Sequence, residues 1–188
     1  MGRWEPNARD RLAEAALELY FERGFDNTTV AEIAERAGLT ERTFFRHFAD
    51  KREVLFAGSS VLVDLLAERV ASAPPTAAPI DAVTAALQAA GAVLQERGAW
   101  AQRRQQVITA NAELRERELI KMTLLVTTMA DALRARGVTD PAASLTAEAG
   151  VAAFRVAFEH WVAQPTKKNL PRLIADSMKQ LRAVTAGL

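Results

Sequence analysis

The stretch that decides the fold runs from Thr28 to Lys51 and reads T-T-V-A-E-I-A-E-R-A-G-L-T-E-R-T-F-F-R-H-F-A-D-K. It contains two short helical patterns separated at residues 37–39, where Gly38 suits a tight turn that needs a positive φ. Ala34 lies four residues before Gly38, and its small side chain lets a second helix cross closely over the first. These features predict a helix-turn-helix, whose second helix can enter the major groove of DNA.

Both short helices have a recognisable start. Glu32 stands three residues after Thr29, which is the capping-box spacing. Thr40 precedes the second helix, where its hydroxyl can accept a hydrogen bond from a free backbone N–H one turn later. Phe44 and Phe48 are four residues apart, so we expect one apolar face of the second helix to lie in the core.

The rest of the chain also favours helices. Alternating β-branched runs bounded by hairpin turns are nearly absent, whereas Ala, Leu, Glu and Arg dominate. The fold is therefore predicted to be all-α, with about nine helices. Besides the two helices of the helix-turn-helix, the patterns predict helices over residues 7–23, 50–71, 80–97, 99–109, 112–136, 141–163 and 170–184.

Prolines at positions 74, 75 and 79 mark the clearest break in the chain, because proline cannot continue a helix. With 188 residues, 49% of them hydrophobic, the chain can bury the core of one large or two small domains. We predict a helix-turn-helix DNA-binding domain over residues 1–52 and a helical domain over residues 53–188. Helix 50–71 is expected to link the two.

The charge of the chain is concentrated locally. The net charge is only +1, but residues 36–52 carry five basic and two acidic side chains, which gives +3. The basic residues of this segment are Arg36, Arg42, Arg46, Lys51 and Arg52. Such a small footprint suffices to contact DNA phosphates, although it provides little long-range steering.

Several kinds of function find no support in the sequence. With no cysteine the chain has neither disulfides nor thiolate metal sites, and His47 and His160 are its two histidines. No nucleophile–base motif, glycine-rich phosphate loop or paired metal-ligand spacing is present. Residues 1–6 lack the apolar core of a signal peptide, and no apolar run approaches the roughly 20 residues of a membrane span. We expect a cytoplasmic protein that is not an enzyme and uses no cofactor or metal.

Residues 22–51 closely resemble the DNA-binding domain of TetR-family transcriptional regulators. The resemblance is carried by Gly24-Phe25, Thr29, Ala37-Gly38, Thr43, Phe44-Phe45, His47-Phe48 and Lys51. It implies a linking fourth helix followed by a helical ligand-binding and dimerisation domain. One position departs from the family pattern, because Phe45 stands where the family very often has a tyrosine that can donate to a phosphate.

The C-terminal half resembles the TetR subgroup related to the mycofactocin regulators. The residues that carry this second resemblance are Arg104, Ile108, Asn111, Ala112, Glu113, Leu114, Arg115 and Glu118. It implies an acyl-CoA or a comparable amphipathic effector.

The predicted DNA-binding residues lie in and around the second short helix: Thr29, Thr40, Glu41, Arg42, Thr43, Phe45, Arg46, His47 and Lys51. Arg42 is the main candidate for reading guanine, since a guanidinium can donate to both O6 and N7. Thr43 could contact a thymine methyl group or a phosphate, and Glu41 either accepts from cytosine or stabilises the helix start. Arg46, His47 and Lys51 either contact phosphates or form a solvated charged face.

An effector site is expected among aromatic, methionine and arginine side chains of the second domain. Its predicted residues are Trp100, Arg104, Met122, Leu125, Met129, Phe154, Phe158 and Trp161. The alternative is that these apolar side chains simply form the core. Arg103, Arg104 and Arg115 could form a cationic mouth for a phosphate- or carboxylate-bearing ligand, or they could be solvated.

Two late helices carry apolar stripes that suit pairing across a two-fold axis, although packing within one chain would explain them as well. The predicted dimer residues are Leu145, Ala149, Ala152, Val156, His160, Leu170, Ile174, Met178 and Leu181. We therefore expect a homodimeric repressor that a small hydrophobic or acyl-CoA-like effector releases from a palindromic DNA operator. The alternative is a DNA-binding protein of the same fold that is regulated by a protein partner or by no ligand.

Overall fold

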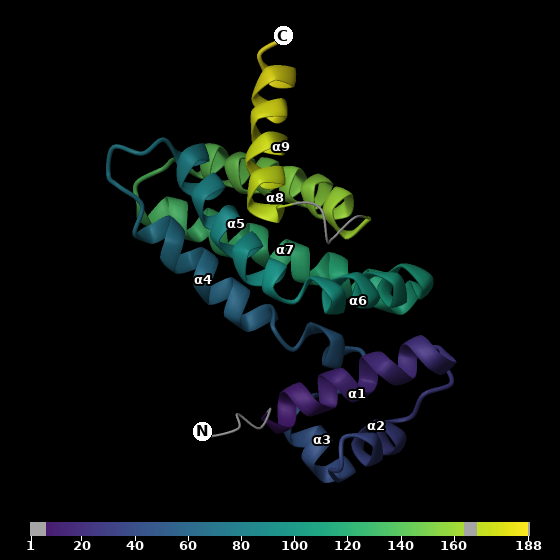
Figure 1. The fold of residues 1–188 in the computed structure, drawn as a ribbon. Helices are drawn as coiled ribbons and strands as arrows, with labels where there is room; N and C mark the ends of the chain where they lie inside the picture. Colours follow the sequence, from purple (N-terminus) through teal and green to yellow (C-terminus); the bar gives the residue numbers. More distant parts are fainter. Residues whose placement is uncertain (1–6, 164–168, 188) are drawn as a thin grey trace, which may run out of the picture. The chain divides into compact units, whose positions relative to one another are not determined.

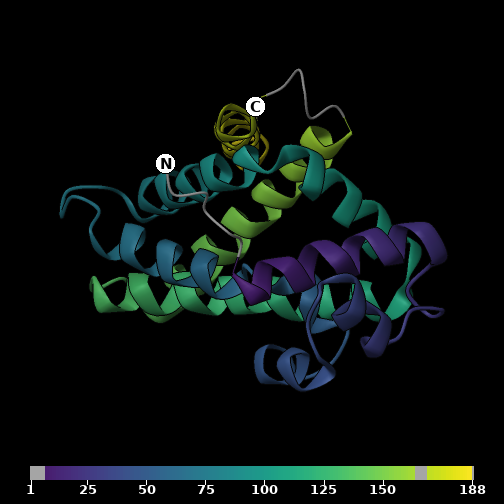
Figure 2. The ribbon, with the colours of Figure 1, turned by 60° about the horizontal axis from the view of Figure 1, so that its bottom comes forward.

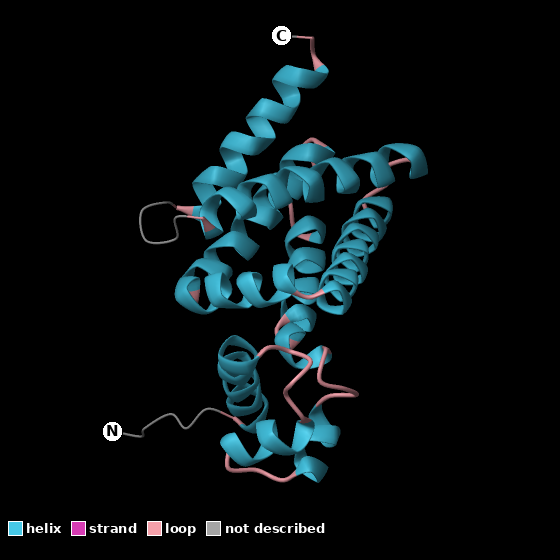
Figure 3. Cartoon of the chain, turned by 90° about the vertical axis from the view of Figure 1, so that its right-hand side faces the viewer, coloured by secondary structure: helices cyan, strands magenta, loops and turns pink. Residues whose placement is uncertain are grey.

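The computed structural model describes residues 7–163 and 169–187, so the segment used above to judge a signal peptide lies outside it. In the described ranges every regular element is a helix (Figure 3), which confirms the all-α prediction. No described helix has the length and apolar character needed to cross a membrane. The elements are α1 (Ala8–Arg23), α2 (Val30–Arg36), α3 (Glu41–His47), the 3-10 helix η1 (Glu53–Phe56), α4 (Ser59–Ala71), α5 (Pro79–Glu96), α6 (Gly98–Ala110), α7 (Ala112–Ala135), α8 (Asp140–Val162) and α9 (Leu170–Thr185).

The chain forms two compact units. Unit 1 comprises residues 1–59 and 103–118, and unit 2 comprises residues 60–102 and 119–188. This division differs from the predicted domains, 1–52 and 53–188, because a segment from the middle of the chain joins the helix-turn-helix. That segment contains most of α6 and the first turns of α7.

Unit 1 is built on α1. This helix contacts α2, α3 and η1, and α2 contacts α3 (Figure 1). Leu12 and Ala16 of α1, Ile33 of α2 and Phe44 of α3 are all completely buried. The apolar face expected for each short helix therefore lies in one common core, where removing these side chains from water stabilises the unit.

The predicted helix 50–71 is wrong in its first part, because η1 occupies residues 53–56 and α4 begins at Ser59. Val54, Leu55 and Phe56 are three successive buried residues. The chain therefore enters the core through a short 3-10 turn before α4 begins. Gly58 follows, and glycine is a poor helix former.

Unit 2 contains α5, α8 and α9, which pack against one another (Figures 1 and 2). Two glycines allow the close approach of these helices. A Cβ atom on Gly91 of α5 would lie 2.6 Å from the Cδ1 atom of Ile174 on α9. A Cβ atom on Gly150 of α8 would collide with Val83 of α5. Any side chain at these positions would therefore push helices of the core apart.

The apolar stripe of α9 faces this core. Leu170 and Ile174 are fully buried, Met178 is 2% exposed and Leu181 packs against the same cluster. Leu170, Ile174 and Met178 are therefore packed within one chain, whereas Leu181 is half-buried, and the dimer role predicted for these residues stays a prediction. The physical reason is that a stripe at helical spacing indicates burial but does not say which partner provides it.

Candidate DNA-binding and effector sites

The starts of α2 and α3 have the predicted caps. The Thr29 hydroxyl accepts from the backbone N–H of Glu32 at 3.2 Å, and the Glu32 carboxylate accepts from the backbone N–H of Thr29 at 2.8 Å. These bonds hold the pKa of Glu32 below its ordinary value. The Thr40 hydroxyl accepts from the backbone N–H of Thr43 at 3.2 Å. Both caps fix where the helices begin, and the α3 cap fixes which residues form its first turn.

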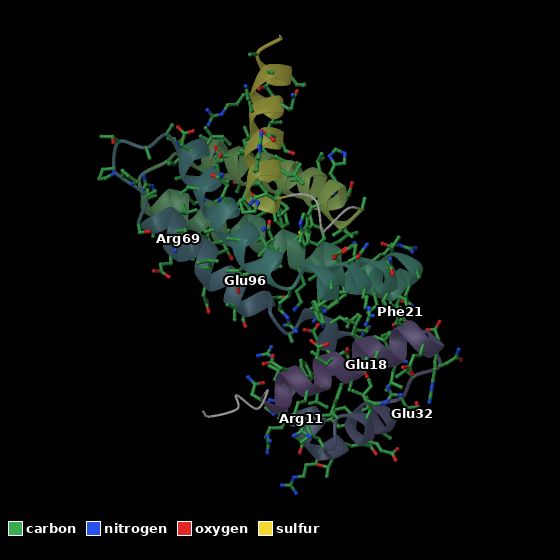
Figure 4. All side chains as sticks on the ribbon, viewed as in Figure 1. Arg11, Glu18, Phe21, Glu32, Arg69 and Glu96 are labelled. Carbon is green, nitrogen blue, oxygen red and sulfur yellow. The ribbon has the colours of Figure 1, made fainter. Side chains whose placement is uncertain are left out.

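The turn between α2 and α3 is closed from α1. Gly38 has a φ of 65°, as its position in the sequence predicted. The Arg11 guanidinium donates to the carbonyl oxygen of Ala37 at 2.5 Å, at the end of α2. A Cβ atom on Gly38 would lie 2.9 Å from the same guanidinium. Figure 4 shows Arg11 on α1 and Glu32 on α2 as labelled sticks.

Helix α3 has one buried and one exposed face. Phe44 is fully buried and Phe48 is 4% exposed, as predicted. Glu41, Arg42 and Arg46 are exposed, and the Phe45 ring is 55% exposed although it has no polar group. The described contacts give Arg42 no ion pair or hydrogen bond, so its guanidinium is available to DNA.

Three of the five basic residues counted in the footprint are engaged within unit 1. Arg36 forms ion pairs with Glu18 and Glu22, each at 3.2 Å. Arg52 pairs with Asp50 at 2.6 Å, and this contact holds the pKa of the Asp50 carboxyl below its ordinary value. The available positive charge therefore lies on α3, and it is smaller than the sequence count of +3 suggested.

Lys51 is the third engaged residue. Its ammonium donates to the carbonyl oxygens of Phe25 and Thr28, both at 2.9 Å, and lies 4.4 Å from the centre of the Phe25 ring. The Tyr20 hydroxyl donates to the Lys51 carbonyl at 2.7 Å, and burial raises the pKa of Tyr20. Lys51 therefore closes the loop between α1 and α2, which leaves little of its ammonium for the predicted phosphate contact.

Two further side chains bear on the DNA-binding face. The Nε2 atom of His47 is buried and has no partner among the described residues, so this nitrogen is not presented for the predicted phosphate contact. The guanidinium of Arg9, in the first turn of α1, lies 5.5 Å from the centre of the Phe48 ring, just after α3.

The predicted effector residues divide between the units, with Arg104 in unit 1 and the other seven in unit 2. Leu125, Met129, Phe154 and Trp161 belong to the core cluster of unit 2, and Met122 and Phe158 pack against it. Phe158 lies 5.8 Å from Phe154 and 5.6 Å from Trp161, measured between ring centres. Three of the predicted side chains thus form one aromatic cluster on α8.

The three arginines of the expected cationic mouth all lie in unit 1. Arg103 stacks over the Phe21 ring at 5.8 Å, and Arg115 donates to the carbonyl oxygen of Thr109 at 2.7 Å. Each of these contacts occupies part of a guanidinium that the prediction had assigned to a ligand.

Arg104 is the most strongly held of the three. Its guanidinium donates to the Leu55 carbonyl at 2.8 Å and to the Glu118 carboxylate at 3.2 Å, and it lies 4.7 Å from the centre of the Phe56 ring. The side chains of Arg104 and Glu118 are only 15% and 20% exposed. Burial lowers the pKa of Arg104, and the Glu118 carboxylate opposes that shift. Arg117 and Glu53 form another ion pair in this unit. We call the Arg104–Glu118 pair with Leu55 the η1 latch, because it fixes α6 and α7 to η1.

The α8 half of the predicted dimer surface is exposed. Leu145 is 70% exposed and Val156 is 47% exposed, while Ala152 and His160 are also exposed and Ala149 is half-buried. These residues follow one another at spacings of four, three, four and four, which places them on one face of the helix.

Comparison with known proteins gives two family matches. Residues 12–57 match the bacterial regulatory proteins of the tetR family, and residues 77–186 match the MftR C-terminal domain. The chain belongs to the TetR family. Its first match covers the helix-turn-helix described above, and its second covers more than half of the 188 residues.

Curated relatives of this TetR-family chain match mainly over part of their length. The transcriptional regulator TcmR of Streptomyces glaucescens is 38% identical over 81 residues, which are 43% of this chain and 36% of TcmR. The mycofactocin biosynthesis transcriptional regulator MftR of Mycobacterium tuberculosis is 33% identical over 54 residues, 29% of this chain and 27% of MftR. The aligned segments thus span about a third of these relatives.

Solved structures match over nearly the whole TetR-family chain. SmeT of Stenotrophomonas maltophilia, in complex with triclosan, gives a TM-score of 0.68 at 21% identity and covers 95% of this chain and 91% of its own. Thermus thermophilus FadR, in complex with lauroyl-CoA, gives 0.59 at 21% identity and covers 92% of each chain. These likenesses establish the fold, and the family makes the chain a DNA-binding transcriptional regulator.

Proposed function

We propose that the chain is a homodimeric repressor that binds a pseudo-palindromic operator through α3 and leaves it when a small effector binds unit 2. The observation that carries the proposal is the first turn of α3. It is fixed by the Thr40 cap and leaves Arg42 exposed and unpaired among the described residues. An arginine placed there can donate to the O6 and N7 atoms of guanine, the most common specific contact in the major groove.

Dimerisation is supported by charge and by α8. After the internal pairs of Arg36, Lys51 and Arg52, one copy offers too few free cations for tight binding, because affinity grows with the number of phosphates contacted. A second copy would double them. The exposed face of α8, with its alanines between Leu145 and Val156, suits close helix pairing across a two-fold axis.

Control by an effector is supported by the path of the chain. Helix α6 begins in unit 2 and ends in unit 1, whereas α7 begins in unit 1 and ends in unit 2. A ligand that shifts either helix would also act on the η1 latch and, through η1, on α1, which contacts both short helices. A coupling free energy of about 3 kcal/mol would lower operator affinity about 150-fold.

The fold neighbours support a small-molecule effector without identifying its class. SmeT is a repressor seen in complex with triclosan, and Thermus thermophilus FadR is a repressor seen in complex with lauroyl-CoA. We therefore keep the acyl-CoA expectation as one ligand class to be tested beside uncharged ligands.

The experiment that tests the proposal is selection of bound DNA from a random pool with the purified full chain, followed by sedimentation of the selected complex. We expect an inverted repeat bound by two copies, with half-sites about 34 Å apart or a near multiple. Enrichment of a single half-site bound by one copy would contradict the dimeric operator. Binding that no small molecule weakens, but that a protein partner does, would favour the alternative of a partner-regulated DNA-binding protein.

A further inference from the structure

Two buried indole donors in unit 2 find no acceptor among the residues that the structure describes. Trp161 is fully buried in the core cluster, and its Nε1 atom finds no hydrogen-bond partner among the described residues. The Nε1 atom of Trp100, on α6, is also buried without a partner. Nearly all buried polar groups in folded proteins are hydrogen-bonded, so two orphaned N–H groups in one unit need an explanation.

Packing alone does not explain the choice of tryptophan. An unsatisfied buried donor destabilises a protein by about 1–3 kcal/mol, and a phenylalanine would fill apolar space without that penalty. A ligand that brings an acceptor to the indole N–H would remove this penalty on binding. The free energy gained would strengthen the binding of ligands that carry an acceptor, and of no others.

The surroundings of Trp161 restrict the rest of such a ligand. Trp161 lies within an aromatic cluster with Phe154 and Phe158, and the buried side chains described in unit 2 are all apolar. A charged group placed there would lose its hydration without gaining a counterion, which is strongly unfavourable. An apolar body with a neutral acceptor fits.

The arginines that the sequence offered for a charged ligand do not change this conclusion. Arg103, Arg104 and Arg115 lie in unit 1, where each is engaged in the contacts described above. The guanidinium of Arg97 stacks over the Trp100 ring at 4.7 Å, on an exposed residue of unit 2. The interior of unit 2 is therefore matched to a neutral molecule rather than to a phosphate or carboxylate.

We propose that the effector is an uncharged apolar molecule with a carbonyl-type acceptor that takes a hydrogen bond from Trp161 Nε1. This inference rests on the proposed effector control of unit 2. It sharpens the expectation of an amphipathic or acyl-CoA ligand by placing recognition on a neutral acceptor.

Matched ligand pairs test the proposal with the full chain by titration calorimetry. The first pair is 2-acetylnaphthalene and 2-isopropylnaphthalene, which have nearly the same shape but differ in the acceptor. The second pair is 2-undecanone and 2-methylundecane. We expect the chain to bind at least one ketone about tenfold more tightly than its hydrocarbon partner.

The variant Trp161→Phe removes the donor and keeps an aromatic ring. We expect it to bring the ketone-to-hydrocarbon affinity ratio to about one while leaving hydrocarbon affinity within about threefold. Trp100→Phe is the parallel variant, and a partial fall of the ratio would show that Trp100 also donates to the ligand. An unchanged ratio in Trp161→Phe, or no binding of any of the four compounds to the wild-type chain, would overturn the proposal.

A third comparison tests neutrality. Lauroyl-CoA binding more tightly than methyl laurate would show that the charged group is recognised and would refute an uncharged effector. Because these assays measure ligand binding directly, they are independent of operator release. A ketone that binds through Trp161 but leaves DNA affinity unchanged would refute the proposed release of the repressor by an effector. The proposed hydrogen bond from Trp161 would still be supported.

Discussion

At the scale of single residues, Lys51 has a structural role in unit 1 beside the phosphate contact that its place in the family motif predicts. In the structure without DNA, its ammonium donates to the carbonyl oxygens of Phe25 and Thr28. Carbonyls in a tight loop need donors, and a lysine from a distant part of the sequence supplies them.

We predict that Lys51→Met destabilises the protein by about 1.5–3 kcal/mol, because hydrogen bonds from a charged donor are lost while the apolar stem is kept. Urea denaturation of the full chain measures this. Arg46→Met, which removes an exposed cation of α3, is the matched control and should keep the stability of the wild type. If the Lys51→Met protein has normal stability but binds DNA more weakly and with a flatter salt dependence, Lys51 contacts a phosphate and does not stabilise the loop.

Arg42 carries the base-reading prediction. Arg42→Ala should relax the base preference at one operator position, with a loss of about 1–3 kcal/mol there and little change elsewhere. Binding to a panel of single-base operator variants provides the measurement. A uniform loss on all sequences would mean that Arg42 contacts only a phosphate.

At the scale of elements, the α2 cap gives a pH prediction. Bonds from Thr29 lower the pKa of Glu32, so this contribution is fully present above the ordinary pKa of a glutamate and is lost as the pH falls through the lowered value. Glu32→Gln keeps an acceptor that does not titrate. The melting temperature of this variant should therefore fall less between about pH 6 and pH 3 than that of the wild type. If the melting temperatures of the variant and the wild type fall equally with pH, the Glu32 cap does not contribute to the acid sensitivity of the protein.

The η1 latch gives the second prediction at this scale. Arg104→Met leaves Glu118 partly buried without its cation, and breaking such a pair typically destabilises by about 3–5 kcal/mol. Arg103→Met removes a neighbouring arginine whose contact is only a stacked ring, and we expect it to resemble the wild type. Thermal denaturation distinguishes the two variants.

A double variant, Arg104→Met with Glu118→Met, distinguishes the cost of leaving Glu118 unpaired from the cost of replacing the Arg104 side chain. We expect it to be more stable than Arg104→Met alone, because no uncompensated charge remains. If the two substitutions instead add their full effects, the two side chains act independently and the latch does not exist as a unit.

At the scale of the whole molecule, the prediction concerns which helix forms the proposed dimer interface. The α9 stripe is buried within its own unit, so the proposed dimer depends on the exposed face of α8. Val156→Glu should produce monomers and reduce operator affinity at least about tenfold, because a buried unpaired charge is strongly unfavourable and the second α3 is lost. Val61→Glu, at a valine of α4 that is 61% exposed, is the control. Analytical ultracentrifugation and operator binding of both variants test this, and a dimeric Val156→Glu protein would place the interface elsewhere.

The sequence by itself determined the helical class, the two capped helices and the turn at Gly38. These features depend on contacts between residues a few positions apart, and their residue types are visible in the sequence. For the same reason Phe44 and Phe48 were correctly placed in the core. The start of α3 at Glu41 follows directly from its cap.

Only the tertiary structure decided which partner each long side chain and each apolar stripe would find. The sequence could not show that Arg104 meets Leu55, that Lys51 meets Phe25, or that the α9 stripe faces its own core. The same composition is compatible with a solvated cation, a phosphate contact or a buried ion pair. Partner choice depends on which distant segments the fold brings together, and periodicity along one helix carries no information about that.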